Sequence, residues 1–373
     1  MKVLQVGKFF PPQIGGMETF LYDLANILNE NGITTDVLCS NVTSETKIEN
    51  VNNYKVVKAG SLGVVASTSI SPSLIKCFKE ISHDYDIVHI HHPNPTANIA
   101  LMFSGFKGKV VLHWHSDIIR QKFLLKFYKP FLLWMLRRSD KIIATSPPYA
   151  EHSNFLKDFK KKIEIIPFGL NTDKMKDINK DLVIKIKERY SDKKIIFSLG
   201  RLIYYKGFEY LIESARYLPD NFVVLIGGIG NLKEKLKLLI KNNKLTEKVF
   251  LLESITYEEK LSYFEVCDLF VLPSIERSEA FGIVQIEAMY FKKPIVSTNI
   301  IGSGVSWVNQ NGISGCVVEP KNPSKLAEAI IKILSNKSIY NNFSVNAYKR
   351  FIDNFHIDMT LKRMVRVYNE LMQ

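Results

Sequence analysis

Two glutamates bracket a mostly apolar stretch in the second half of the chain, RSEAFGIVQIEAM (277–289). If residues 281–289 are helical, Glu279 and Glu287 stand about 12 Å apart, at 1.5 Å of rise per residue. Two carboxyl groups that act across one glycosidic bond must lie within about 5–10 Å of each other. These two acids therefore cannot share one bond, but each can accept hydrogen bonds from vicinal sugar hydroxyls. Their spacing predicts a nucleotide-sugar site with the ribose at one acid and a hexose at the other.

Groups that bind anions accompany the two acids. A helix that begins between them presents free backbone N–H groups to a pyrophosphate. The residues expected to carry these donors are Phe281, Gly282 and Ile283. In GRLIYYKG (200–207), Arg201 ends a predicted strand and Lys206 precedes a helix. A fork-shaped guanidinium and a compact ammonium suit a diphosphate leaving group, although two solvated loop charges produce the same pattern.

Glycines follow the first predicted strand in FFPPQIGGMETFLYDLANIL (9–28). Gly15 and Gly16 stand just before an amphipathic helix, where backbone can approach a phosphate closely. The spacing differs from G-x-G-x-x-G, so no nicotinamide cofactor is predicted. The glycine turn IGGIGNLKEK (226–235) departs from both the dinucleotide and the P-loop patterns and is weak evidence by itself.

Five histidines stand at the ends of two predicted strands, in VHIHHP (88–93) and VLHWHSD (111–117). One interpretation is a metal-dependent hydrolase that uses His113, His115 and Asp117. The histidine that such a class places directly after the aspartate is absent, because residue 118 is isoleucine. The other interpretation is that an imidazole donates a hydrogen bond to a sugar hydroxyl. We expect no metal.

The predicted elements alternate between short β-branched runs and longer helical patterns. The strands are expected at 2–7, 35–40, 54–59, 86–91, 109–115 and 141–146, and then at 193–200, 221–228, 249–252, 268–274, 293–299 and 315–320. Strands that are apolar on both faces and separated by helices indicate parallel sheets covered on both sides. Two such sets predict an α/β protein with two doubly wound domains. The boundary falls near 163–181, and every motif above follows a strand, where ligands bind in such folds.

The bulk composition limits the classes of partner. The four cysteines are widely spaced and fit a reduced, cytosolic protein without a thiolate zinc cluster. No signal peptide and no run of about 18 apolar residues is visible. The net charge of +13 suits phosphorylated ligands or an anionic membrane surface. It would also suit nucleic acid, but no motif for binding nucleic acid is present.

With these motifs the chain resembles the retaining glycosyltransferases of family 4, which have the GT-B fold. The resemblance rests on Glu279-x7-Glu287, GRLIYYKG, the glycine pair, HWHSD and NGISGCVVEPKNP (311–323), and covers nearly the whole chain. It implies two Rossmann-like domains that face a central cleft. The implied divisions are 1–172 for an acceptor-side domain, 173–355 for a nucleotide-sugar domain, and 356–373 for a helix that packs back on the first domain.

The resemblance also assigns roles to residues. Glu287 would bind the ribose, Glu279 the donor hexose, and Arg201 and Lys206 the diphosphate. Further donor contacts would come from His115 near the reacting centre, from Gly16 beside the diphosphate, and from the backbone of Phe281, Gly282 and Ile283. The configuration of the sugar would be retained without an enzyme nucleophile, and neither a cofactor nor a metal would be needed. Stabilisation of the leaving group and positioning would then account for catalysis.

More specific stretches are similar to bacterial mannosyltransferases of O-antigen and polysaccharide assembly. They are HWHSDIIRQKFLLKFYKPFL, ATSPPYAEHS and IGSGVSWVNQNGISGCV. Where members of that family often carry a Pro-Glu pair near the donor, this chain has Gly302-Ser303-Gly304-Val305-Ser306. GDP-mannose is the first choice of donor, and a UDP-hexose is the alternative. The implied acceptor is a glycan linked to polyprenyl diphosphate.

Basic and aromatic residues alternate in RQKFLLKFYKPFLLWMLRR (120–138). The segment is too short and too charged to span a bilayer, and we expect Pro130 to interrupt or begin a helix. Such a composition suits a segment that lies among lipid headgroups, while an ordinary helix packed on the domain core is the alternative. Together with the resemblance, it predicts a cytoplasmic enzyme that docks reversibly on the inner face of the cell membrane.

Overall fold

The computed structural model describes residues 1–13, 15–66, 68–118 and 122–373, which form two compact units. Unit 1 comprises Met1–Leu170 together with Ile357–Gln373, and unit 2 comprises Asn171–His356. Arg120, which belongs to the segment predicted to meet a membrane, lies outside the described residues. The first and last segments of the chain therefore belong to the same unit.

Unit 1 is built on an eight-stranded sheet with the order β10-β9-β8-β7-β1-β2-β4-β3. Its neighbouring strands are parallel, except that β3 runs antiparallel to β4. The strands are β1 (Lys2–Val6), β2 (Thr34–Ser40), β3 (Lys47–Val51), β4 (Tyr54–Ala59), β7 (Ile87–His92), β8 (Lys109–Trp114), β9 (Lys141–Ala144) and β10 (Ile163–Ile165). A short hairpin of β5 (Val64–Val65) and β6 (Thr68–Ser69) stands apart from this sheet.

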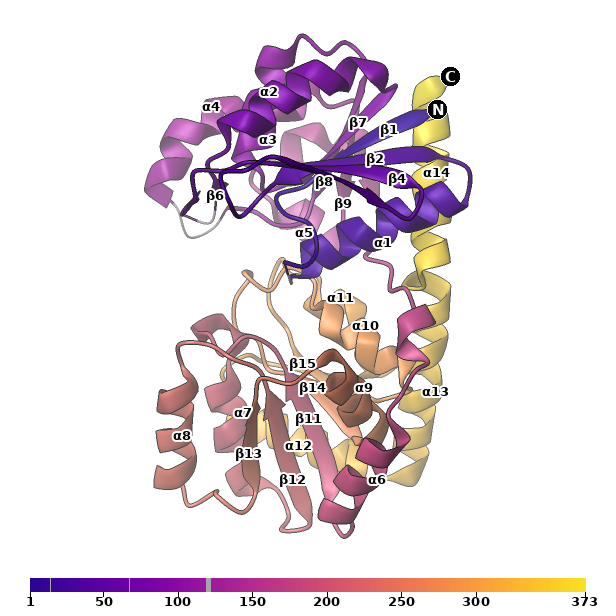
Figure 1. Ribbon diagram of the computed structural model, residues 1–373. Coiled ribbons are helices and arrows are strands. Elements are labelled where there is room, and N and C mark those ends of the chain that lie inside the picture. Colours follow the sequence, from indigo (N-terminus) through magenta and orange to yellow (C-terminus); the bar gives the residue numbers. More distant parts are fainter. Residues whose placement is uncertain (14, 67, 119–121) are drawn as a thin grey trace. The chain divides into compact units, whose positions relative to one another are not determined.

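Helices cover both faces of this sheet (Figure 1). On one side α1 (Gly16–Glu30) contacts α14 (Ile357–Met372), which is the C-terminal helix. On the other side α2 (Pro72–Ile81), α3 (Pro95–Ser104) and α4 (Lys122–Arg138) pack in sequence. The short α5 (Pro147–His152) follows β9. Because both faces are covered, central strands are buried throughout; all six residues of β7 are buried.

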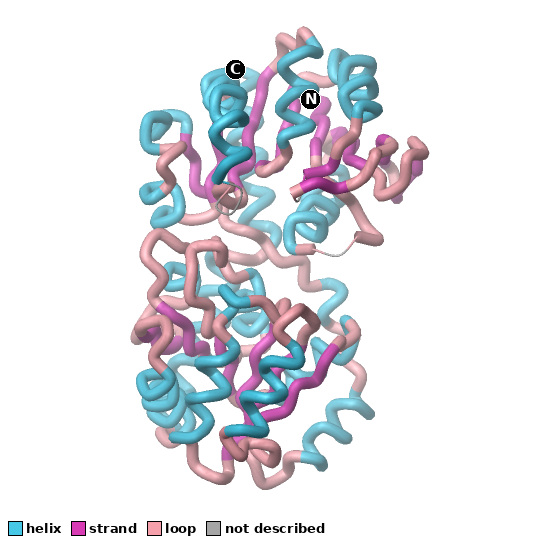
Figure 2. The backbone as a smooth tube through the Cα atoms, turned by 90° about the vertical axis from the view of Figure 1, so that its left-hand side faces the viewer, coloured by secondary structure: helices cyan, strands magenta, loops and turns pink. Residues whose placement is uncertain are grey.

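Unit 2 contains a six-stranded parallel sheet with the order β13-β12-β11-β14-β15-β16. The strands are β11 (Lys194–Leu199), β12 (Phe222–Gly227), β13 (Val249–Glu253), β14 (Leu269–Leu272), β15 (Ile295–Thr298) and β16 (Gly315–Val318). Figure 2 shows the strands of this unit in magenta between cyan helices. The sheet thus has the doubly wound arrangement that the alternation of strands and helices predicted.

The core of unit 2 follows the two-residue period of its strands. Ile196, Val224 and Val271 form one cluster with α7 (Phe208–Ser214), α8 (Lys233–Asn242) and α12 (Pro323–Leu334). The neighbour Phe197 instead packs its ring against Phe264 of α9 (Tyr257–Val266). The remaining helices are α6 (Lys180–Arg189), α10 (Ile283–Tyr290), α11 (Val305–Val308) and α13 (Lys337–Asn354).

All twelve predicted strand ranges contain an observed strand, and the ends differ by at most a few residues. The expectation for Pro130 was wrong, because α4 runs continuously through this proline. Proline removes one backbone hydrogen bond, but the turns on either side are long enough to continue the helix. No described helix is both long and apolar enough to cross a bilayer.

Candidate functional site

The carboxyl ends of β11 and β14 bring two predicted motifs together in unit 2. These strands are neighbours, and the chain proceeds from them toward opposite edges of the sheet, from β11 to β12 and from β14 to β15. Ligands of doubly wound folds bind outside such a switch point. The loop after β11 and the loop after β14 are joined there by a hydrogen bond of 2.8 Å from the N–H of Ile275 to the carbonyl of Tyr205.

Lys206 and Glu279 form an ion pair at this switch point. The distance from Lys206 Nζ to Glu279 Oε2 is 2.6 Å, and the two side chains are only 10% and 11% exposed. The hydroxyl of Ser274 donates a second hydrogen bond to the same carboxylate oxygen, over 3.1 Å. Gly200 leaves room for the lysine, since a Cβ there would stand 3.2 Å from Nζ. The sequence predicted that each of these two charged side chains would contact the ligand separately. In the structure they form an ion pair with each other.

Glu287, the second predicted acid, also has a basic partner. Its Oε1 accepts a hydrogen bond of 2.8 Å from Nζ of Lys260, and both side chains are largely buried. Lys260 lies on α9, with its ammonium 4.5 Å from the centre of the Tyr257 ring. This lysine was not among the predicted site residues. Nothing in its local pattern distinguishes it from other lysines on the exposed sides of helices.

The predicted N–H donors lie at the start of α10. This helix begins at Ile283, and Gly282 before it has a φ of +78°, a conformation that favours glycine. The first N–H groups of a helix have no acceptor within it, and Gly282 has no side chain to supply one. Arg201 is exposed, and its guanidinium donates to the hydroxyl of Tyr205 over 3.1 Å. This guanidinium, the start of α10 and the Lys206–Glu279 pair all belong to loops at the same edge of the sheet.

The loop in which the sequence departs from the family pattern supports the backbone of Glu279. The N–H of Gly304 donates to the carbonyl of Ala280 over 2.8 Å, and the hydroxyl of Ser303 donates to the carbonyl of Glu279. In return, Nε of Arg277 donates to the carbonyl of Gly302 over 2.8 Å. The loop therefore fixes the orientation of the segment that carries this acid.

In unit 1, the predicted glycine pair stands where α1 begins. Gly15 is extended, with a φ of −178°, and Gly16 is the first residue of the helix. A Cβ on Gly15 would lie 2.2 Å from the carboxylate oxygen Oε2 of Glu18, in the first turn. An acidic side chain thus lies beside the glycines that were predicted to approach a phosphate.

The histidines at the ends of β7 and β8 form a buried array. Possible metal-ligand nitrogens of His91, His113 and His115 lie within 4.8 Å of one another. Asp117, which the hydrolase interpretation joined to His113 and His115, instead accepts hydrogen bonds of 2.8 Å from Trp114 Nε1 and Ser153 Oγ. Nδ1 of His91 and Nε2 of His115 are hydrogen-bonded to each other at 2.8 Å.

Burial keeps these imidazoles neutral. It lowers the pKa of His91 and of His92 from 6.5 to about 3. It is also the largest cause of lower pKa values for His89, His113 and His115, with a smaller contribution from the neighbouring imidazoles. Neutral rings suit hydrogen bonding through one donor and one acceptor nitrogen each.

Unit 1 is predicted to lose stability as the pH falls below 6.5. Below that pH the five histidines bind protons in the unfolded state but stay neutral in the folded state, because burial lowers their pKa values. Protonation therefore favours the unfolded state. Each histidine contributes about 1.4 kcal/mol per pH unit. The two histidines whose pKa falls to about 3 together lower the free energy of unfolding by about 4 kcal/mol at pH 5, and His89, His113 and His115 act in the same direction. This is a large part of the total stability of a domain.

Tryptophan emission during urea unfolding at several pH values measures this loss. Trp307 is the single tryptophan of unit 2, so a Trp307→Phe background confines the signal to unit 1. His152→Gln, which removes an exposed imidazole of the same unit, is the matched control and should leave the profile unchanged. A free energy of unfolding that stays constant from pH 7 to pH 5 would contradict neutral burial.

Comparisons with known proteins agree with this architecture. Residues 14–174 match the model described as Glycosyltransferase Family 4, and residues 179–350 match the one described as Glycosyl transferases group 1. The chain is 34% identical over 378 residues to O-antigen chain mannosyltransferase C of Escherichia coli, covering 100% of this chain and 99% of that protein. It is 30% identical to D-rhamnosyltransferase WbpZ of Pseudomonas aeruginosa, covering 88% of this chain and 86% of that protein.

Solved structures share the fold at lower identity. Sucrose-phosphate synthase from Thermosynechococcus elongatus superimposes with a TM-score of 0.82 at 19% identity, covering 100% of this chain and 99% of that one. Anabaena HepE, solved in complex with UDP and glucose, has a TM-score of 0.76 at 16% identity and covers 99% of this chain and 100% of its own. With two Rossmann-like units and a full-length relative at 34% identity, the chain belongs to the family 4 glycosyltransferases of the GT-B fold.

Proposed function

We propose that this chain is a retaining hexosyltransferase that moves mannose from GDP-mannose to a lipid-linked bacterial surface glycan. The observation that carries the proposal is that the Lys206–Glu279 pair lies at the same edge of the unit 2 sheet as the start of α10, the helix that carries Glu287. The full-length similarity to an O-antigen mannosyltransferase supports both the hexose and the acceptor class.

The charges of the site suit the departure of a diphosphate. Arg201 is exposed, and its guanidinium keeps N–H donors for phosphate oxygens beyond the one that it gives to Tyr205. Lys206 Nζ likewise keeps donors beyond the one that it shares with Glu279. The first N–H groups of α10 add partial positive charge at the same edge. Negative charge grows on the leaving diphosphate as the glycosidic bond breaks, so donors fixed in advance stabilise the transition state more than the ground state.

The two acids then act in binding. Glu279 is held by Lys206 and Ser274, so its remaining lone pairs have a defined direction toward a hexose hydroxyl. Glu287 is held by Lys260 and accepts from the ribose hydroxyls. Each acid keeps its own cationic partner, which supports their assignment to different parts of one donor. Gly15, Gly16 and His115 of unit 1 remain predicted donor contacts.

The donor has one alternative. A UDP-hexose would use the same diphosphate and ribose contacts, and the structural relative HepE was solved with UDP and glucose. The contacts to the diphosphate do not distinguish the two donors, because the base and the hexose are recognised by other groups. Titration of the chain with GDP, UDP and their sugars by calorimetry distinguishes the two donors.

Glu287→Gln is predicted to weaken recognition of the ribose hydroxyls, because an amide oxygen still accepts a hydrogen bond but carries no charge. The wild-type protein should bind GDP, or UDP if that is the donor nucleotide, about 10- to 100-fold more tightly than the 2′,3′-dideoxy analogue, because a hydrogen bond to a charged group contributes about 1.5–3 kcal/mol. The variant should prefer the nucleotide with ribose hydroxyls by a clearly smaller factor, since a neutral hydrogen bond contributes only about 0.5–1.5 kcal/mol. Isothermal titration calorimetry measures the four affinities.

Glu265→Gln provides the control, since this exposed glutamate lies on α9 outside the site. It should discriminate between the two nucleotides as the wild type does. If Glu287→Gln keeps the full preference for the ribose hydroxyls, the assignment of Glu287 is wrong. If neither GDP nor UDP binds the wild type, the assignment of the donor class is wrong.

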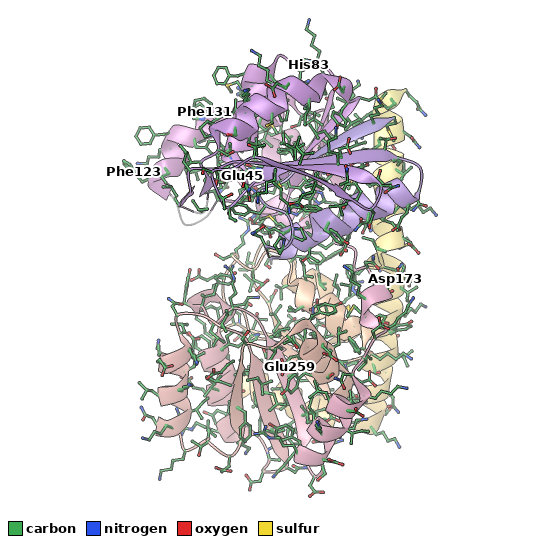
Figure 3. The ribbon with its side chains drawn as sticks, viewed as in Figure 1. Glu45, His83, Phe123, Phe131, Asp173 and Glu259 are labelled. Atoms are coloured by element: carbon green, nitrogen blue, oxygen red, sulfur yellow. The ribbon has the colours of Figure 1, made fainter. Side chains whose placement is uncertain are left out.

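We also propose that unit 1 docks on an anionic membrane surface through α4. The outward face of this helix exposes Phe123, Leu124, Phe127 and Phe131, with exposed fractions of 71%, 50%, 67% and 40%. Figure 3 shows Phe123 and Phe131 pointing outward from α4. Phe103 of the adjacent α3 adds a further ring, 66% exposed. Aromatic rings with lysines between them suit the headgroup layer of a bilayer.

Lys126 and Lys129 are exposed on the same helix. Their joint change to glutamate should weaken binding to anionic vesicles by at least about 30-fold, since each surface cation contributes about 1 kcal/mol toward anionic lipid. Flotation with phosphatidylglycerol vesicles measures the bound fraction, which should also fall with salt. Lys185→Glu with Lys187→Glu on α6 of unit 2 is the matched control and should float like the wild type. Wild-type protein that does not float at low salt would contradict the docking proposal.

A further inference from the structure

The short hairpin of unit 1 carries apolar side chains although it lies on the surface. Its strands β5 and β6 are antiparallel and pair Val64 with Ser69 and Val65 with Thr68. Leu62, Val64 and Val65 have exposed fractions of 77%, 53% and 62%. Successive residues of a strand point to opposite faces, so the exposure of both valines means that the core covers neither face of β5. The hairpin therefore presents an apolar projection to its surroundings.

Hydrogen bonds at the base of the hairpin define its position. The N–H of Leu62 donates to the carbonyl of Ile70 over 2.8 Å, and the N–H of Ile70 donates to the carbonyl of Gly63 over 3.0 Å. The hydroxyl of Ser71 donates to the carbonyl of Gly60 over 2.7 Å. A two-stranded hairpin alone is at best marginally stable in water. An apolar environment around its exposed side chains would stabilise this one further.

The beginning of α3 joins the hairpin to α4. The hydroxyl of Thr96 donates to the carbonyl of Ser69 in the hairpin. Two residues later, Nδ2 of Asn98 donates to the hydroxyl of Tyr128 on α4 over 2.6 Å. Because α3 follows β7, its start marks the carboxyl edge of the unit 1 sheet. The hairpin therefore lies at this edge, on the side of unit 1 that carries α3 and α4 (Figure 1).

The charges on these three elements favour one kind of partner. Residues 60–75, which include the hairpin, contain no charged side chain, and α3 contains none either. The charged residues of α4 are all basic, although the chain contains 37 acidic residues. An apolar surface with only positive charge fits an anionic bilayer, whose phosphates attract the cations while its acyl chains accept the apolar groups. A second copy of this chain, with its net charge of +13, would instead be repelled.

We propose that the β5–β6 hairpin is a second membrane-contact element, which inserts Leu62, Val64 and Val65 at the boundary between lipid headgroups and acyl chains. The hairpin supplies apolar insertion, and α4 supplies electrostatic attraction as well. The insertion is shallow, because unpaired backbone groups along the edges of a hairpin need water or headgroups as partners. The carboxyl edge of the unit 1 sheet then lies near the headgroups. Its use there for a lipid-linked acceptor rests on the proposed function, whereas the membrane contact rests on the surface of unit 1.

Replacement of Leu62, Val64 and Val65 by serine tests the apolar contribution. The triple variant keeps the net charge, so its affinity for phosphatidylglycerol vesicles should fall by about tenfold or more with an unchanged salt dependence. Because the three side chains are exposed, circular dichroism should show an intact fold. The matched control replaces three apolar residues of unit 2 by serine, with exposed fractions of 53%, 60% and 65%, namely Ile184, Leu238 and Val345. It should bind vesicles like the wild type.

A fluorophore at residue 65 measures the insertion itself. Val65→Cys in a Cys77→Ser background places one accessible thiol in the hairpin, since the other three cysteines are buried. With a polarity-sensitive dye on this thiol, emission should shift to the blue on phosphatidylglycerol vesicles. Lipids brominated near the headgroup end of their acyl chains should quench it. The same dye on Leu238→Cys in unit 2 should show neither change.

The outcomes separate the hairpin from the other proposed contacts. If the triple variant binds vesicles like the wild type, or if the dye at residue 65 stays in water on the bound protein, the hairpin inference is wrong while docking through α4 stands. If the wild type binds no vesicles, both membrane contacts are wrong, and the nucleotide titrations still test sugar transfer. A wild-type dimer in analytical ultracentrifugation that the triple variant dissociates would also overturn the inference, because the hairpin would then join two copies of the chain.

Discussion

Burial of both faces of each parallel sheet is the constraint on which the arrangement of polar groups depends. Central strands such as β7 and β12 have no exposed residue, so charged groups collect mainly at the strand ends. The strand order reverses between one pair of neighbouring strands in each unit, which is β1 with β7 in unit 1 and β11 with β14 in unit 2. Ligands of doubly wound folds bind at this switch point. The Gln5–His91 hydrogen bond lies at the first pair, and the Lys206–Glu279 ion pair lies beyond the second.

The two switch points carry different electrostatics. In unit 2 the groups are ionised and paired, and taking such a pair out of water is tolerated only when the remaining lone pairs are also satisfied. The hydroxyl of Ser274 meets part of that need for Glu279, and a sugar hydroxyl would meet more of it. In unit 1 burial keeps the histidines neutral, and they are joined by hydrogen bonds instead of ion pairs. One unit therefore carries paired charges at its switch point, and the other carries a neutral hydrogen-bonded array.

Much of the fold was predictable because strands of a buried parallel sheet consist of nearly continuous apolar residues, which are easily recognised in the sequence. Four observed strands lie outside the predicted ranges, namely β3, β5, β6 and β10. β3 and β5 are largely exposed, and β6 and β10 are only two and three residues long, so none of them has that pattern. The two glutamates were recognisable because they stand close together in the chain. Lys260, 27 residues before Glu287, has no local signal. Gln5 did have one, since a polar residue inside the buried strand KVLQV needs a partner, but the identity of that partner depends on the tertiary fold.

The metal interpretation illustrates the same limit. Sequence adjacency favoured Asp117 as a partner of His113 and His115, whereas strand pairing brings His91 beside them from β7. Residues at equivalent heights on neighbouring strands are close in space, although they are far apart in the chain. The carboxylate of Asp117, beyond the end of β8, is used to hold Trp114 and Ser153.

The affinity of Glu279→Gln for a nucleoside diphosphate and for the corresponding nucleotide-sugar tests the central claim most directly. If Glu279 reads the hexose while it restrains Lys206, the variant should bind GDP as tightly as the wild type or more tightly, because the lysine is released toward the diphosphate. It should bind GDP-mannose no more tightly than GDP, since the contribution of the hexose is lost. Calorimetry of both ligands gives the answer, with the uridine pair in parallel. An equal loss of affinity for both ligands, or no loss of the contribution of the hexose, would contradict the account.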